Sequence, residues 1–314
     1  MLKNIIKNIA SKFGLVLLSA YDSKRQEKYL EITEQLANSL TVSYETDCSI
    51  IIFSKDRAMQ LDALLGSFFH FAKNPPALKI IYRASSNPFE SAYDEVKTAY
   101  IANNVEFIKE QNFKADLTTA LETINSSKVF FLVDDIIFKE TVDFNYFEKI
   151  DPKKQILSLR LGKHLNFAYT LQKEQKLPDL SPSKEFNQLL SWDWNLAEYD
   201  WAYPLSVDGN LFDTSEVKIM VNHLNYKAPN SFEEALQLMT PLYAQRRGLC
   251  FEKSVIVNNP CNKVQTENPN VHGAITIEEL NNKWLEGYRI DFKTFQGIEN
   301  KSAHQELPLK FIKR

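Results

Sequence analysis

The chain has 314 residues, of which 44% are hydrophobic and 25% charged, as in a globular protein with one large domain or two modest ones. The net charge of −3 argues against a general nucleic-acid binder. Three cysteines, Cys48, Cys250 and Cys261, lack the spacing of a zinc site and favour a reducing, cytoplasmic compartment. No apolar stretch reaches the roughly 18 residues that a membrane-spanning helix needs.

The N-terminal segment, residues 1–47, is expected to be helical. Within residues 1–18, apolar side chains recur at helical spacing with lysines between them. This pattern predicts an amphipathic helix that lies either on an anionic membrane, at its inner face, or on the protein's own core. A signal peptide fits less well, because Lys7 and Lys12 interrupt the apolar region.

Strands and helices alternate from residue 48 onward. Short apolar runs predict strands at 48–53, 78–82, 105–108 and 129–133. Apolar residues at helical spacing between these runs predict three helices. The alternation is typical of an α/β fold with a mainly parallel sheet.

An acidic pair, Asp134 and Asp135, directly follows the fourth predicted strand. In open α/β sheets, ligands bind at the carboxyl ends of the strands. Two adjacent carboxylates repel each other unless a cation, sugar hydroxyls or positive side chains offset their charge. The pair therefore predicts a site for a divalent metal, a sugar, or both, and the alternative is a strand-end turn paired to basic neighbours.

Several common motifs are absent from the sequence. There is no Gly-rich dinucleotide fingerprint, P-loop or Gly-x-Ser-x-Gly elbow. The turn after the first strand, residues 54–57, carries a single carboxylate, whereas a phosphatase or response regulator needs several acidic residues there.

The first strand, its Ser-Lys-Asp-Arg turn, the four strand–helix steps and the acid pair together resemble the GT-A fold glycosyltransferases of the family-2-like branch. The resemblance covers residues 48–135 well and 150–265 loosely, with adjacent aspartates in place of the usual Asp-x-Asp. It implies a GT-A-like, Rossmann-type α/β sandwich with an N-terminal helical extension. It divides the rest of the chain into a nucleotide-sugar-binding half, 48–150, and an acceptor-binding half with a tail, 151–314.

The resemblance also implies an activity. Such enzymes move a sugar from a nucleoside-diphosphate sugar to an acceptor, here a glycan or a lipid-linked acceptor, with Mn²⁺ or Mg²⁺ bound at the acid pair. Asp135 and Asp134 would hold the metal, and a late histidine, His272, is a candidate further ligand. The implied nucleotide-binding residues are Ser54, Lys55, Asp56, Arg57, Arg83, Lys114, Asp116 and Asp134.

An inverting transfer needs a base that takes the proton of the acceptor hydroxyl. Relatives place an acid at the start of a helix after the sugar-binding segment. Glu233 fits this position, with Glu234 in reserve. The alternative for both is charge stabilisation of the helix N-terminus.

The second half contains candidates for sugar contacts. Asp208 could bind donor or acceptor sugar, or belong to a turn in which Gly209 adopts positive φ. Trp192, Trp194 and Trp201 could present aromatic faces to sugar rings, with core packing as the alternative. Arg160 could reach phosphates or sugar hydroxyls.

Two other functions compete with the glycosyltransferase hypothesis. The same fold could serve as a catalytically inactive sugar-nucleotide or glycan-binding protein in a polysaccharide assembly system. A nucleotidyltransferase is disfavoured, because that class needs a Gly-rich loop where this chain has residues 54–57.

Overall fold

The computed structural model describes residues 20–39, 43–262 and 275–314. The chain divides into two compact units, Met1–Thr41 and Val42–Arg314, and the described part of the first is helix α2 (Ala20–Ala37). The amphipathic helix expected within residues 1–18, with its membrane contact, lies outside the described residues. Across the three described ranges, no helix has both the length and the apolar character that crossing a membrane requires.

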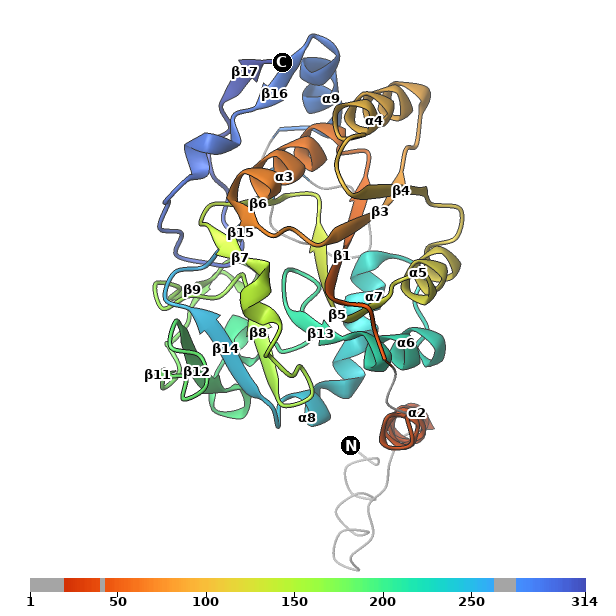
Figure 1. Cartoon of the computed structure of the whole chain (residues 1–314), viewed down its shortest axis with the longest axis vertical. Helices are drawn as coiled ribbons and strands as arrows, with labels where there is room; N and C mark the ends of the chain where they lie inside the picture. The colour runs from red at the N-terminus through yellow and green to blue at the C-terminus, as the bar shows by residue number, and fades with distance from the viewer. Residues whose placement is uncertain (1–19, 40–42, 263–274) are drawn as a thin grey trace, which may run out of the picture. The chain divides into compact units, whose positions relative to one another are not determined.

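A five-stranded sheet organises the second unit (Figure 1). Its strands are β1 (Thr46–Lys55), β3 (Ala77–Arg83), β4 (Val105–Lys109), β5 (Ser126–Val133) and β13 (Leu211–Asp213), in the spatial order β13-β5-β1-β3-β4. All neighbouring pairs are parallel except β13 with β5. The predicted α/β fold with a mainly parallel sheet is confirmed.

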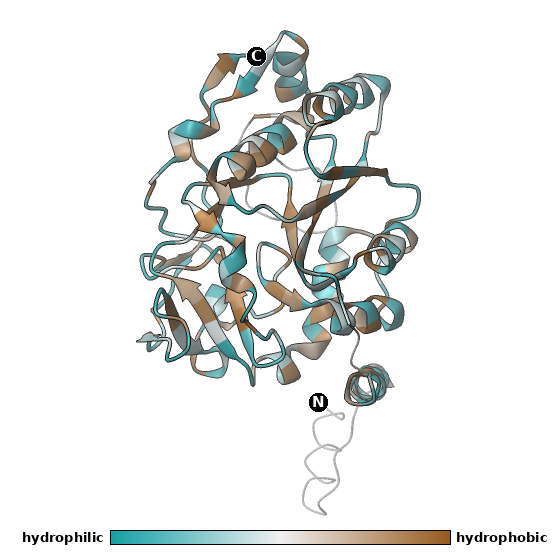
Figure 2. Ribbon diagram, in the orientation of Figure 1, coloured by the Kyte–Doolittle hydropathy of each residue, from teal (hydrophilic) through white to brown (hydrophobic). Residues whose placement is uncertain are grey.

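The central strands form where the sequence has continuous apolar runs. Ile50, Ile51 and Ile52 of β1 are all fully buried, so this strand is covered on both faces. In a parallel sheet, the helices of the strand–helix–strand crossovers pack on both faces, so the central strands are buried on both sides. Figure 2 shows the central strands as largely hydrophobic, with the flanking helices divided between polar and apolar faces.

Helices cover the sheet on opposite faces. Helices α3 (Ala58–Phe71) and α4 (Asn87–Ala99) pack together, as do α5 (Phe113–Glu122) and α6 (Thr214–His223). Right-handed crossovers place α3 and α4 on one face and α5 on the other, because the strand order reverses between β4 and β5. The adjacent strands β1 and β5 therefore flank the topological switch point, where ligands bind in such sheets.

A second sheet is built largely from the later half of the chain. It has the order β11 (Ser181–Pro182), β12 (Leu189–Asp193), β14 (Arg247–Phe251) and β8 (Gln155–Ser158). Two-stranded pairings join β2 (Ala72–Lys73) to β7 (Val142–Asp143), β6 (Ile136–Phe138) to β15 (Ile256–Asn258), β9 (Phe167–Ala168) to β10 (Lys173–Glu174), and β16 (Tyr288–Ile290) to β17 (Phe311–Lys313). The later helices are α7 (Pro229–Leu236), α8 (Thr240–Tyr243) and α9 (Ile277–Leu285). The 3-10 helices are η1 (Phe144–Phe147), η2 (Tyr169–Leu171), η3 (Trp194–Leu196), η4 (Tyr199–Ala202), η5 (Gln237–Met239) and η6 (Phe292–Phe295).

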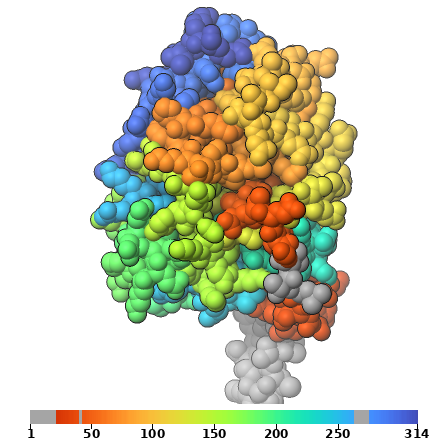
Figure 3. Space-filling view, in the orientation of Figure 1, coloured from red at the N-terminus to blue at the C-terminus, as the bar shows by residue number. Residues whose placement is uncertain are grey.

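The two halves expected on either side of residue 150 share one hydrophobic core. Strand β13 extends the sheet formed by the first half, and buried residues of both halves belong to the same cluster. The C-terminal residues, blue in Figure 3, lie beside α3 and α4, and α9 contacts both helices. The site described next draws residues from both halves for this reason.

Candidate functional site

A cavity of about 850 Å³ opens at the carboxyl ends of β1 and β5. Its walls come from both halves of the chain: the turn after β1, the acid pair after β5, the segment 199–208, helix α7 and the C-terminal segment. The sequence candidates that line it are Ser54, Lys55, Arg57, Arg83, Asp134, Asp135, Asp208, Glu233 and Glu234. The cavity therefore lies where the sheet topology predicts a ligand site.

Asp134 is the more constrained member of the acid pair. Its Oδ2 accepts hydrogen bonds from Ser54 Oγ at 2.9 Å and from the backbone N–H of Lys55 at 3.1 Å. Its Oδ1 accepts from Arg57 Nη1 at 2.9 Å. Both oxygens are thus occupied by groups of the first βα turn, which fixes the turn against the end of β5.

Asp135 has one oxygen to spare. Its Oδ2 accepts from Arg57 Nη1 at 3.1 Å, whereas its buried Oδ1 has no hydrogen-bond partner among the described residues. Burial, together with repulsion from Asp134 and Asp208, raises the pKa of the Asp135 carboxyl to about 6. A carboxylate oxygen without a hydrogen-bond partner, on a residue that lines the cavity, is a candidate contact for a cation.

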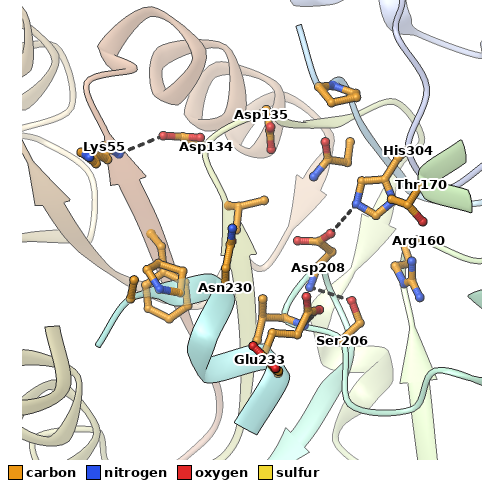
Figure 4. A pocket seen from close by; sticks show the side chains of 18 of the residues that line it. Lys55, Asp134, Asp135, Arg160, Thr170, Ser206, Asp208, Asn230, Glu233 and His304 are labelled. Carbon is orange, nitrogen blue, oxygen red and sulfur yellow. Dashed lines mark hydrogen bonds and ion pairs between the residues drawn. The ribbon is translucent and has the colours of Figure 1, made fainter. Parts of the chain in front are cut away.

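Glu233 projects from α7 into the same cavity (Figure 4). Its Oε1 accepts a hydrogen bond from the backbone N–H of Val207 at 3.0 Å. Burial, with repulsion from Asp208, raises the pKa of the Glu233 carboxyl to about 7. Because α7 begins at Pro229 and has no acid in its first turn, the alternative of N-terminal charge stabilisation does not fit Glu233 or Glu234.

Asp208 lies between the acid pair and α7 in Figure 4, and it is paired to His304. The distance between His304 Nε2 and Asp208 Oδ2 is 2.8 Å. Burial alone would raise the pKa of Asp208, but the hydrogen bond to His304 and its charge lower it. The same hydrogen bond raises the pKa of His304 against the effect of its burial. Gly209 follows with φ +84°, so the predicted turn and a cavity-facing Asp208 occur together.

Arg160 also lines the cavity and is 3% exposed. Its Nη1 donates to Asp200 Oδ1 at 3.1 Å, while its buried Nε has no hydrogen-bond partner in the described parts of the chain. Tyr203, from the same aromatic segment as Asp200, contributes to the wall as well.

Three nucleotide-binding candidates lie away from the cavity lining. Asp56 adopts φ +56° and its Oδ1 accepts from the backbone N–H of Ser85 at 2.6 Å, which ties the β1 turn to the end of β3. Lys114 donates to the carbonyl of Leu224 at 2.6 Å. Asp116 accepts from the backbone N–H groups of Gln111 and Asn112, just before α5. Each of the three therefore has a structural partner, and their nucleotide contacts stay predictions.

The three tryptophans singled out for sugar binding are buried. Trp192, Trp194 and Trp201 are at most 1% exposed and pack against one another. The indole N–H of Trp192 donates to the carbonyl of Trp201 at 3.0 Å. This is the core packing given above as the alternative. The aromatic residues of this segment that do line the cavity are Tyr199 and Tyr203.

Sequence reasoning missed His304 and Asp200. His304 stands in a polar tail with no recognisable motif, and its partner Asp208 is 96 positions away. Asp200 lies within an aromatic-rich stretch in which only the aromatic residues were selected as candidates. The histidine that was singled out, His272, lies outside the described residues.

The acid pair fits a divalent cation through a single protein oxygen. Within the described ranges, no group of three or more His, Cys, Asp or Glu side chains is arranged to hold a metal ion. The unpartnered Oδ1 of Asp135 nevertheless offers one hard oxygen ligand. Mg²⁺ is commonly bound by one or two carboxylates and completed by substrate phosphates and water, so one oxygen is enough when a diphosphate is present.

Comparisons with known proteins relate the chain to a glycosyltransferase. No protein-family model matches it. The bifunctional glycosyltransferase pgtA of Dictyostelium discoideum is 26% identical over 217 residues, which cover 60% of this chain. The match spans only 28% of the length of that relative.

Solved structures with some likeness to this chain include a mannosyltransferase and a nucleotidyl transferase. S. aureus TarS in complex with UDP-GlcNAc is 12% identical, with a TM-score of 0.43, over 72% of this chain and 60% of that chain. The mannosyltransferase PcManGT of Pyrobaculum calidifontis, in complex with GDP-Man and Mn²⁺, is 13% identical, with a TM-score of 0.29, over 50% of this chain and 48% of that chain.

Proposed function

We propose that this protein is a glycosyltransferase that moves a sugar from a nucleoside-diphosphate sugar to a hydroxyl of a glycan or lipid-linked acceptor. The observation that supports this most is the pairing, in one cavity, of an acid pair at the switch point of a parallel sheet with a second carboxylate, Glu233, whose pKa is raised. The similarity to pgtA over 60% of the chain supports the same class of reaction.

The two ends of the cavity suit the two substrates. The diphosphate would lie at the acid pair, near Lys55 and Arg57, and the nucleoside along the ends of β1 and β3, where Arg83 also lines the wall. The sugar would then extend toward Asp208. The acceptor would enter beside α7, within reach of Glu233.

Glu233 would act as the base of a single displacement. The acceptor oxygen forms a bond to the anomeric carbon while the bond from that carbon to the diphosphate oxygen breaks. The hydroxyl proton passes to the Glu233 carboxylate, and the nucleoside diphosphate leaves with the electron pair. This route inverts the anomeric configuration.

Asp135 would hold the divalent cation, Mn²⁺ or Mg²⁺. The cation would offset the negative charge that develops on the departing diphosphate. Asp134 would contribute by positioning, since both of its oxygens already bind the β1 turn.

The first test is Asp135→Asn, assayed for sugar transfer and for donor hydrolysis with a panel of UDP- and GDP-sugars and Mn²⁺. We expect activity to fall by about 10²-fold or more, on the scale of removing one electrostatic contact in a transition state. Asp94→Asn, an exposed carboxylate on α4 outside the cavity, is the matched control and should keep full activity. Full activity in Asp135→Asn would refute the role of the acid pair. If the native protein binds the donor but does not turn it over, a glycan- or sugar-nucleotide-binding function is favoured instead.

A further inference from the structure

Arg57 is built into the fold as the partner of the acid pair. Its Nη1 donates to both Asp134 and Asp135, and its Nη2 donates to the carbonyl of Asn262. The backbone N–H of Arg57 donates to the hydroxyl of Tyr93 at 3.1 Å. Because the Arg57 side chain is only 9% exposed, it cannot move into solvent without breaking these contacts.

In this arrangement the acid pair offers a cation few oxygen ligands and little net negative charge. Three of the four oxygens of the pair accept hydrogen bonds from Ser54, Lys55 or Arg57, and only Asp135 Oδ1 has no partner among the described residues. The positive charge of Arg57 also offsets one of the two negative charges. An approaching cation would therefore meet a single oxygen and about half of the attraction of an unpaired acid pair.

We propose that Arg57 is an internal counter-ion that makes cation binding at Asp135 depend on a nucleoside diphosphate. This inference rests on the proposed function, because it takes the diphosphate as the ligand of the cavity. Bound diphosphate supplies the oxygens that a hard cation still needs, and its negative charge offsets Arg57. Since coupling between two ligands is reciprocal, the cation strengthens nucleotide binding by the same factor.

The test measures Mn²⁺ binding without nucleotide, by the electron paramagnetic resonance signal of free Mn²⁺. We expect the native protein to bind Mn²⁺ weakly and Arg57→Gln to bind it at least tenfold more tightly, because the charge of the pair is no longer offset. Arg57→Lys is the matched control, since it keeps the positive charge, and it should bind as weakly as the native protein. The double variant Arg57→Gln with Asp135→Asn should lose the gain, which locates the new affinity at the acid pair.

A second measurement uses the native protein alone, because the glutamine variant leaves a buried acid pair without its partner and can fail to fold. Calorimetry with UDP or GDP present, corrected for the Mn²⁺–nucleotide complex in solution, should show Mn²⁺ affinity raised at least tenfold over that of the free protein. Equally tight Mn²⁺ binding with and without nucleotide would overturn the proposal, as would a folded Arg57→Gln variant with unchanged nucleotide-free affinity.

These outcomes separate this inference from the proposed function. A native protein that transfers sugar but binds Mn²⁺ tightly without nucleotide would retain the function and refute the role of Arg57. A gain of Mn²⁺ binding in Arg57→Gln, without any sugar transfer by the native protein, would support the role of Arg57 and refute the proposed function.

Discussion

The surroundings of Glu233 suit its carboxyl group to the proposed role of base. Its backbone position on α7 is ordinary, but its half-buried carboxylate is repelled by Asp208 and accepts a hydrogen bond from the N–H of Val207. Burial and repulsion both penalise the charged form, so the pKa rises to about 7. A carboxyl group with this pKa is suited to proton transfer near neutral pH.

A pH dependence follows from that pKa. The base must be deprotonated, so kcat/KM for sugar transfer should rise with pH through about 7 and level off above it. Glu233→Gln should lower the rate by 10²-fold or more and abolish this rise while donor binding persists. The measurement is a pH–rate profile of both proteins from about pH 5.5 to 8.5, a range that brackets a pKa of about 7 and lies above the usual pKa of a glutamate, about 4.3.

The neighbouring glutamate provides the control for this prediction. Glu234 also lines the cavity but is exposed, so Glu234→Gln should lower the rate less and keep the rise near pH 7. A larger loss in Glu234→Gln than in Glu233→Gln would transfer the role of base to the reserve candidate.

At the scale of elements, the turn between Asp208 and β13 is held by one glycine. Gly209 has φ +84°, and a Cβ at this position would lie 2.5 Å from Ile256 Cδ1. Both the positive φ and the close approach of Ile256 Cδ1 disfavour a larger residue at this position. The turn thereby directs Asp208 into the cavity and returns the chain to the edge of the central sheet.

Gly209→Ala should therefore destabilise the protein through two effects. Strained backbone at positive φ costs on the order of 1–3 kcal/mol, and overpacking adds typically about 1–3 kcal/mol. Gly287→Ala is the matched control, because Gly287 has the same φ of +84° with no atom within 4 Å of its Cβ position. Thermal unfolding should show a larger fall in midpoint for Gly209→Ala, and equal falls would mean that the contact with Ile256 relaxes freely.

Sequence patterns predicted the elements whose signals are local. The apolar runs of β1, β3, β4 and β5 were found close to their predicted bounds, and the three predicted helices lie between them. Strand β13 and the sheet around β12 and β14 were not predicted, because strands of three to five residues with mixed polarity carry little periodic signal. Their pairing depends on contacts between residues far apart in the chain.

The same division holds for the site. The acid pair could be predicted because a strand's end and a ligand edge are both readable from the sequence. The partnership of Asp208 with His304 could not, since it joins segments 96 positions apart and neither stands in a motif. The burial of Trp192 against its aromatic neighbours likewise depends on tertiary packing that composition does not determine.

For the molecule as a whole, the proposed donor site predicts a selective gain in stability. A ligand that binds only the folded state, at a hundredfold its dissociation constant, adds about 2.7 kcal/mol. We expect one nucleotide among UDP, GDP, CDP and dTDP to raise the thermal midpoint clearly when Mn²⁺ is present, by several degrees at about 2–4 °C per kcal/mol. Mn²⁺ alone should give little change, because Arg57 already offsets the acid pair.

Asp135→Ala and the chelator EDTA provide the controls for this experiment. Each should remove the Mn²⁺-dependent part of the shift, since Asp135 Oδ1 is the carboxylate oxygen of the pair left without a partner in the described structure. A shift with the preferred nucleotide that survives both treatments would mean that Lys55 and Arg57 hold the diphosphate without a cation. The absence of a shift with all four nucleotides would refute the proposed donor site. The proposed cation takes most of its ligands from phosphate oxygens, so it requires a bound nucleoside diphosphate.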